Sequence, residues 1–241
     1  MLSDALSAPS PAVAPIRAML TPQQEKAVSD PAEFVSMLVA RRSGKTFTCV
    51  VKCLEVGFST EYGDIIYVAL TKKQAKDIVW PTFKKFNDQH DLGLKFNETL
   101  SEITFPGQTK LRLFGGDRPA EIDRLRGQSF NLVVIDEGKS YKPWTLKELI
   151  DDVIDPGLGD HMGQLFLIGT PGWIFTGGPF YEATTGEDKG FGFHEQFSFH
   201  TWTLEDNTAM PHLWERALRK KVQKGWDDDS ATWIREYLGR W

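Results

Sequence analysis

A compact apolar run at residues 34–39 leads through a short polar loop, residues 40–46, into residues 47–54, which have helical spacing. The loop ends in Gly44, Lys45 and Thr46. A strand, loop and helix in this order place backbone N–H groups at a helix N-terminus, where they bind phosphate oxygens. The lysine of such a loop reaches the β and γ phosphates of a nucleotide, and the threonine hydroxyl binds Mg²⁺. The pattern therefore predicts a phosphate-binding loop, although Val39 stands where the general pattern has its first glycine.

Further apolar runs alternate with helical patterns along the chain. The sequence predicts helices at residues 21–29, 71–90, 213–224 and 230–238, strands at 64–70, 131–135, 164–168 and 193–202, and a hairpin of residues 99–105 and 109–114. Continuously apolar strands are typical of a parallel sheet that is covered on both faces. We therefore expect an α/β fold with a mainly parallel central sheet flanked by helices.

The strand at residues 131–135 ends on Asp136 and Glu137, which supply the carboxylates that the loop needs for hydrolysis. Asp136 suits the binding of Mg²⁺ through its waters, and Glu137 suits the polarisation of an attacking water. An Asp-Glu pair at a strand end is by itself usually a solvated turn. After a phosphate-binding loop, at this distance, the pair indicates an ATPase that uses ATP and Mg²⁺.

A strand at residues 64–70 comes between the loop strand and the Asp-Glu strand in the sequence. Many small phosphate-binding-loop proteins place those two strands side by side. An inserted strand, together with Glu137, predicts the RecA-like, catalytic-glutamate branch of these proteins.

Three regions follow from this pattern. Residues 1–19 include a run of alanine, proline and serine with no apolar period, which predicts a flexible N-terminal arm. Residues 20–205 hold the alternating strands and helices, and we expect them to form the ATPase core. Residues 206–241 are expected to form a small helical linker or lid.

The formal net charge of −5 argues against a protein that simply coats DNA, because phosphate binding is driven by excess lysine and arginine. A local basic patch is still compatible with a DNA substrate. One candidate cluster, which has a solvated helix face as its alternative, comprises Lys72, Lys73, Lys76, Lys84 and Lys85.

Cys49 and Cys53 lie four residues apart on one expected helix, which favours buried reduced cysteines over a metal or redox pair. No apolar run approaches the roughly 20 residues that cross a bilayer, so we expect a soluble, intracellular protein without a membrane partner.

Five segments together resemble the large terminase subunit of tailed bacteriophages. They are the arginine-rich loop at residues 40–46, the Arg-Gly segment at 125–127, the Asp-Glu strand at 130–137, Gly-Thr-Pro at 169–171, and the ending at 235–241. The similarity extends over about residues 20–241.

The resemblance implies roles for three arginines. Arg126 would act as an arginine finger on the ATP of a neighbouring subunit, and its alternative is a surface arginine at a helix end. Arg41 would contact phosphates in its own subunit, and Arg42 is the alternative. Around the nucleotide the resemblance implies a set that comprises Arg41, Arg42, Ser43, Gly44, Lys45 and Thr46.

Two further residues gain roles from the resemblance. Thr170 would sense the γ-phosphate, with an ordinary strand-to-turn threonine as the alternative. Gln24 resembles an adenine-reading glutamine, because its amide can both donate to and accept from adenine. It also stands at the third helical position after Thr21, where it would instead cap its helix.

The resemblance also implies the setting of the protein. It implies a DNA-packaging motor that associates into a ring on a portal protein, in the host cytoplasm during virus assembly, with double-stranded DNA and a small terminase subunit as further partners. Large terminases carry a C-terminal nuclease, which we expect to lie outside this chain. The acidic clusters at residues 151–152 and 227–229 are accordingly assigned to helix faces and caps. The alternatives are a RecA-like helicase or translocase fragment and a non-motor ATP-binding switch.

Overall fold

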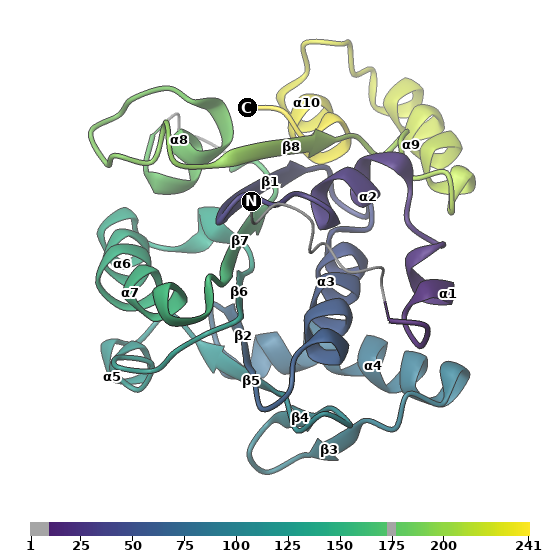
Figure 1. Ribbon diagram of the computed structural model, residues 1–241. Coiled ribbons are helices and arrows are strands. Elements are labelled where there is room, and N and C mark those ends of the chain that lie inside the picture. Colours follow the sequence, from purple (N-terminus) through teal and green to yellow (C-terminus); the bar gives the residue numbers. More distant parts are fainter. Residues whose placement is uncertain (1–9, 173–176) are drawn as a thin grey trace, which may run out of the picture.

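Eight strands form one sheet in the computed structural model, which describes residues 10–172 and 177–241 (Figure 1). The order across the sheet is β3-β4-β5-β2-β6-β7-β1-β8. The six strands from β5 to β8 in this order are parallel, and β3 and β4 add an antiparallel edge. The strands are β1 (Phe34–Val39), β2 (Asp64–Ala69), β3 (Lys95–Asn97), β4 (Glu102–Thr104), β5 (Lys110–Gly115), β6 (Leu132–Ile135), β7 (Gln164–Gly169) and β8 (Ser198–Trp202). The expected α/β fold with a mainly parallel sheet is confirmed.

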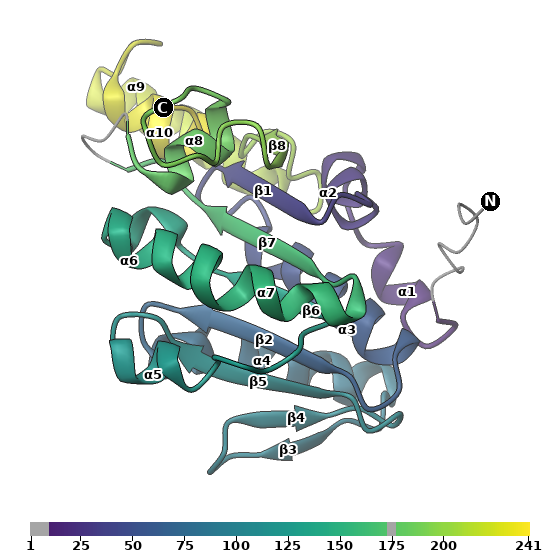
Figure 2. The same ribbon diagram turned by 60° about the vertical axis from the view of Figure 1, so that its left-hand side comes forward.

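Helices cover both faces of the sheet (Figures 1 and 2). One layer consists of α1 (Ala14–Arg17), α2 (Pro22–Val28), α3 (Lys45–Ser59) and α4 (Lys72–His90). The other consists of α5 (Pro119–Asp123), α6 (Pro143–Glu148), the π-helix η2 (Leu149–Ile154), α7 (Asp155–Leu158) and α8 (Pro179–Thr185). Short 3₁₀ turns are η1 (Gly138–Ser140) and η3 (Gly159–His161). The chain closes with α9 (Pro211–Lys224) and α10 (Ala231–Leu238).

The continuous apolar character of the strands follows from this arrangement. Ile65 and Tyr67 of β2 pack into the α1–α4 layer, whereas Ile66 and Val68 of the same strand pack into the layer of α5–α8. All four side chains are fully buried. Because successive strand residues point to opposite faces, a sheet covered on both sides needs apolar residues at every position.

The strand inserted between the loop strand and the Asp-Glu strand is β7, and the prediction that residues 64–70 fill this place is wrong. In the sheet β1 pairs with β7, and β7 pairs with β6, while β2 lies on the far side of β6. Order along the chain does not fix order in a parallel sheet, because each crossover helix can skip a neighbouring strand.

The end of the expected flexible arm is helical where the structure describes it. Val13 and Ile16 are fully buried and belong to the core of the α1–α4 layer. Arg17 forms ion pairs with Glu25 of α2 and Glu55 of α3. Residues 10–19 therefore differ from the expectation, because two apolar side chains anchor a segment that its alanine and proline content marked as flexible. Residues 1–9 lie outside the described part.

Two smaller features of this layer bear on the site. Cys49 and Cys53 are free, fully buried residues of α3, and burial raises the pKa of both thiols. The interpretation as buried reduced cysteines is thus confirmed for this structure. Among the described residues, no helix is both long enough and apolar enough to cross a membrane.

The pair α9 and α10 forms a separate small cluster. Leu204, Ala217 and Trp233 pack together there against Ala40, the first residue after β1. Leu204 also donates its backbone N–H to the carbonyl of Tyr237 at 2.9 Å. The C-terminal helices are therefore attached to the sheet at the loop that follows β1.

Candidate functional site

The loop after β1 turns sharply into α3 at Gly44. Gly44 has φ of +90°, and a Cβ placed on it would lie 2.2 Å from Nε2 of Gln24. Only glycine combines this backbone conformation with so close an approach. Val39, at the position of the missing first glycine, is the fully buried last residue of β1. The departure from the general pattern thus falls within a strand, where a side chain packs in the core.

Hydrogen bonds from three other segments hold the loop in place. The carbonyl of Ser43 accepts from Nε1 of Trp202 at 2.8 Å and from Nε2 of Gln24 at 3.2 Å. Nδ2 of Asn207 donates to the carbonyl of Arg42 at 2.9 Å. Because these carbonyls are occupied from outside, the loop conformation is fixed by the protein itself.

Lys45, the first residue of α3, lies against the Asp-Glu pair at the end of β6. Its Nζ is 2.8 Å from Oδ1 of Asp136 and also contacts Oε1 of Glu137. Burial alone would lower the pKa of Lys45, but the two carboxylates outweigh it and raise the pKa above its usual value. The loop and the carboxylates predicted from separate parts of the sequence therefore meet in one cluster.

Asp136 is nearly fully buried, at 1% exposure, and is held on three sides. Besides Lys45, its Oδ2 accepts from the hydroxyl of Tyr67 at 2.6 Å, and its Oδ1 accepts from the backbone N–H of Glu137 at 2.7 Å. Burial and the neighbouring carboxylate raise the pKa of the Tyr67 hydroxyl, so it stays protonated and able to donate. Nothing in the sequence pattern of β2 singled out Tyr67, because it reads as an ordinary core aromatic residue.

A pocket of about 1020 Å³ opens over this cluster. From the predicted set it is lined by the loop residues Arg41, Arg42 and 44–46, together with Gln24, Glu137 and Thr170. Thr170 follows the last residue of β7, so its position at the same sheet edge as Glu137 is a consequence of the parallel order. Residues outside the prediction also line the pocket, among them Gln74, Lys85, Phe86, Asn207 and Met210.

Three predicted residues lie elsewhere. Ser43 is fully buried and its hydroxyl donates to the carbonyl of Ala40 at 2.6 Å. Asp136 lies in contact with Lys45 but does not line the pocket. Arg126 is exposed after α5 and pairs with Asp123 at 2.9 Å and with Glu148 at 3.0 Å. Within one chain, Arg126 is not part of this pocket.

The two loop arginines differ in their partners. Arg41 forms an ion pair with Glu236 of α10, with 2.7 Å between Nε and Oε2. Arg42 has a positive φ of 64° and no ion-pair partner among the described residues. Both line the pocket, so the geometry leaves Arg42 the freer of the two to meet an anion.

Gln24 forms the capping box that was the alternative to adenine reading. Its Oε1 accepts from the backbone N–H of Thr21 at 2.9 Å, and its own N–H faces Oγ1 of Thr21. With Nε2 directed to Ser43, both ends of the amide have partners within the chain. The adenine-reading role stays a prediction.

The lysines of α4 are partly neutralised. Lys76 and Lys84 both pair with Glu98, the former at 2.5 Å and the latter at 2.8 Å. These two lysines lower the pKa of the Glu98 carboxyl to about 2. Lys85 lines the pocket beside Phe86. The candidate basic patch is therefore divided between an ion-pair cluster and the pocket wall.

The oxygen donors fit a divalent cation such as Mg²⁺. The carboxylate of Asp136 and the hydroxyl of Thr46 are hard oxygen ligands of the type that Mg²⁺ prefers. In addition, Asp136 and Glu137 already share one positive charge, that of Lys45. A cation held there would neutralise negative charge on bound phosphates.

The fold and this cluster define an α/β protein whose parallel sheet presents a glycine-lysine-threonine loop, an Asp-Glu pair and a pocket at one edge. No protein-family model matches the sequence, and no curated protein matches it. Solved structures do match.

The chain is similar to the large terminase ATPase domain of Thermus phage P74-26, with a TM-score of 0.65, 19% identity, and coverage of 90% of this chain and 92% of that one. It is similar to the full large terminase of a thermophilic bacteriophage, with a TM-score of 0.70, 14% identity and 92% coverage of this chain. For the HK97 bacteriophage large terminase the TM-score is 0.63 at 17% identity, again with 92% coverage of this chain.

The chain spans 53% of the thermophilic bacteriophage protein and 50% of the HK97 protein. At these identities the likeness concerns the fold. The predicted resemblance is confirmed at that level, because the fold is that of large terminase ATPase domains over about nine-tenths of the chain.

Proposed function

We propose that this chain is the ATP-hydrolysing motor domain of a viral DNA-packaging terminase, which couples ATP hydrolysis to the translocation of double-stranded DNA into a procapsid. The observation that carries the proposal is the contact of Lys45 with both Asp136 and Glu137 beneath a pocket lined by the loop. The large terminase of the thermophilic bacteriophage, which shares the fold, was solved in complex with ADP.

The strand order supports the RecA-like, catalytic-glutamate branch. β7 separates β1 from β6, and Glu137 follows β6 with its side chain in the pocket. The helices α9 and α10 would form the C-terminal lid, because they pack on the loop at Ala40. We assign residues 20–205 to the ATPase core and 206–241 to this lid.

Each group of the cluster has a chemical task in this proposal. The backbone of the loop and Lys45 would bind the phosphates, and Thr46 and Asp136 would hold Mg²⁺, which neutralises phosphate charge. Glu137, at 34% side-chain exposure, would accept a proton from the attacking water. When ATP and Mg²⁺ bind, Lys45 would exchange its carboxylate contacts for phosphate, which frees Glu137 for this task.

Thr170 would respond to the γ-phosphate from the end of β7, and Arg126 would act on the ATP of a neighbouring subunit. Its exposed position supports an action in trans, because it lies outside the pocket of its own chain. A ring of subunits on a portal protein, with a small terminase subunit as a further partner, would place the motor in the host cytoplasm during assembly.

The decisive experiment measures ATP binding and phosphate release in two variants. Glu137→Gln should bind ATP like the wild type and lower turnover by roughly 10²- to 10⁴-fold, because it removes a general base. Lys45→Ala should lose both binding and turnover. Matched controls are the exposed Glu33→Gln and Lys26→Ala, which should change neither. Turnover like that of the wild type in either site variant would refute the assignment.

Two alternatives give different results. A helicase or translocase fragment of the same branch would belong to a full-length protein that unwinds DNA. A non-motor switch would bind ATP tightly with negligible turnover, whether or not DNA is present. Turnover that rises with DNA, without unwinding, would favour the packaging motor.

A further inference from the structure

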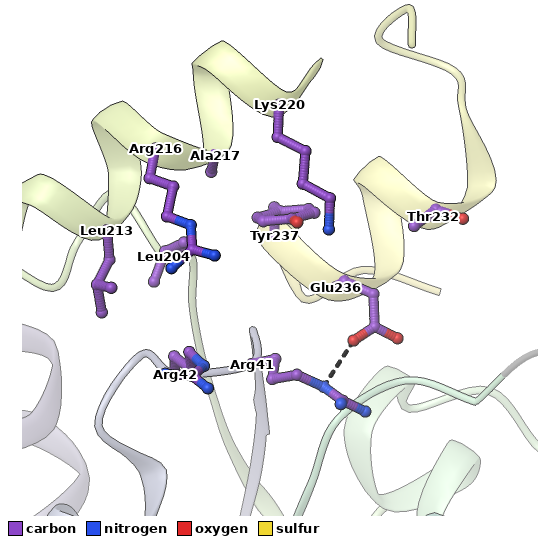
Figure 3. A pocket seen from close by; sticks show the side chains of 10 residues that line it. All are labelled: Arg41, Arg42, Leu204, Leu213, Arg216, Ala217, Lys220, Thr232, Glu236 and Tyr237. Carbon is purple, nitrogen blue, oxygen red and sulfur yellow. Dashed lines mark ion pairs between the residues drawn. The ribbon is translucent and has the colours of Figure 1, made fainter. Parts of the chain in front are cut away.

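A second cavity, of about 390 Å³, lies on the other side of the loop, between it and the helices α9 and α10 (Figure 3). Arg41 and Arg42 form its floor, Arg216 and Lys220 reach into it from α9, and Glu236 and Tyr237 border it from α10 (Figure 3). The cavity is thus lined by four cations and one carboxylate, in a chain whose net charge is −5.

Its only lining carboxylate is already neutralised within the described residues. Glu236 accepts from Nε of Arg41 at 2.7 Å and from Nε of Arg235 at 2.9 Å. Arg42 and Arg216 have no ion-pair partner in the described part of the chain, and Lys220 lies over the ring of Trp226 at 5.7 Å. Like charges that share a cavity repel one another, and an anion between them relieves this repulsion.

The charge continues outward along α9. A shallow groove beside the cavity is lined by Arg216, Arg219, Lys220, Gln223 and Lys224. Residues 216, 220 and 224 are four apart, so they lie above one another on one face of the helix. Arg219 has only a distant carboxylate, that of Glu215 at 4.0 Å. Helix α9 therefore presents a cationic face, Arg216, Arg219, Lys220 and Lys224, that leads into the cavity.

We propose that this cationic face and the cavity bind the phosphate backbone of double-stranded DNA. A row of arginine and lysine side chains without close acidic partners is the usual means of sequence-independent backbone binding. The lysines of α4 are the weaker candidate, because Glu98 neutralises Lys76 and Lys84. The inference rests on the proposed function for its choice of DNA as the ligand.

The position of Arg42 gives the contact a consequence for ATP hydrolysis. Arg42 lines both this cavity and the pocket over Lys45. A DNA phosphate that draws the Arg42 side chain toward α9 removes its charge from the nucleotide pocket. DNA bound on α9 is therefore expected to alter ATP turnover through one shared side chain.

The test measures binding of a fluorescent duplex by anisotropy at several salt concentrations. The double variant Arg216→Ala/Lys220→Ala should bind at least about 10-fold more weakly, and its salt dependence should fall by a slope of about 2, one for each lost phosphate contact. The charge-matched control on α4, Lys73→Ala/Lys84→Ala, should bind within about 2-fold of the wild type. Both variants change exposed side chains, and thermal melting verifies that they are folded.

Equal losses in the two variants, or a loss in the α4 variant alone, would overturn the proposal. So would unchanged DNA binding in the α9 variant combined with lost quenching of tryptophan fluorescence by inorganic phosphate, which would define a small-anion site. ATP turnover without DNA is measured on the same samples. Normal turnover with unaltered DNA binding in the α9 variant refutes this inference alone, whereas absent turnover in the wild type refutes the proposed function.

Discussion

Arg41 and Glu236 are joined twice, once through their side chains and once through their backbones. Nε of Arg41 lies 2.7 Å from Oε2 of Glu236, and the backbone N–H of Arg41 donates to the carbonyl of Glu236 at 3.0 Å (Figure 3). The Arg41 side chain is 71% exposed, so the ion pair itself stabilises the fold by about 1 kcal/mol at most. Its larger effect is to hold a phosphate-facing arginine against α10.

Removing the charge of Glu236 should therefore favour nucleotide binding. In the Glu236→Gln variant the Arg41 side chain is no longer held by a carboxylate and is free to turn toward the pocket. We expect ATP affinity to rise by roughly 2- to 5-fold, because a larger fraction of molecules is ready to bind. Titration with a fluorescent ATP analogue measures the change.

The matched control for this prediction is Glu215→Gln, whose carboxylate lies 4.0 Å from Arg219 on the exposed side of α9. It should leave ATP affinity unchanged. Weaker ATP binding by Glu236→Gln would show that the ion pair holds Arg41 in its binding position.

The hydroxyl of Tyr67 should contribute to stability through Asp136. Tyr67→Phe removes the 2.6 Å hydrogen bond to Oδ2 of a carboxylate that is only 1% exposed. A buried charged acceptor that loses one donor costs about 1–3 kcal/mol. Urea unfolding should show a loss in this range, and the control Tyr62→Phe, at 80% exposure, should show almost none. Equal stability of both variants would contradict the prediction.

Much of the fold was predictable because its signals are local. The strand that ends at Val39 and the capping box of Thr21 and Gln24 depend on neighbours in sequence, and the structure has both. The strand that ends before Asp136 is also present. Order across the sheet depends on which strand each helix crosses, and this is why β7 and not β2 separates β1 from β6.

The site divides in the same way. Lys45, Asp136 and Glu137 were predicted to act together because glycine-lysine-threonine loops and strand-end carboxylates each have a recognisable pattern. Tyr67 and Asn207 have none, since one reads as a core aromatic residue and the other as a loop residue. Their contacts, to Asp136 and to the carbonyl of Arg42, arise only when distant segments pack together.

Gln24 offers a test that separates structural support from adenine recognition. Its amide bonds to Thr21 and to Ser43, so Gln24→Ala should destabilise the fold by about 1–2 kcal/mol and weaken ATP and GTP binding alike. The control Thr21→Ala disturbs the same cap and leaves the amide in place. Nucleotide titrations and thermal melting measure both effects. A selective loss of ATP binding in Gln24→Ala would instead establish the adenine-reading role.

Arg126 provides the test of cooperation between subunits. It pairs with Asp123 and Glu148 on an exposed surface and does not line the pocket of its own chain. If it acts on a neighbouring ATP, wild-type turnover per subunit should rise steeply with protein concentration, and Arg126→Ala should lower turnover by roughly 10³-fold or more. The control Arg124→Ala removes a nearby arginine that pairs with Glu121, and it should stay close to the wild type.

Mixing experiments then separate action in trans from a local defect. An Arg126→Ala subunit keeps Lys45 and Glu137, so it retains a complete pocket, whereas a Glu137→Gln subunit retains Arg126. Two inactive variants mixed in equal amounts should therefore recover part of the turnover, because each subunit supplies the group that its neighbour lacks. Mixtures that stay inactive although the subunits associate would place the effect of Arg126 within its own chain.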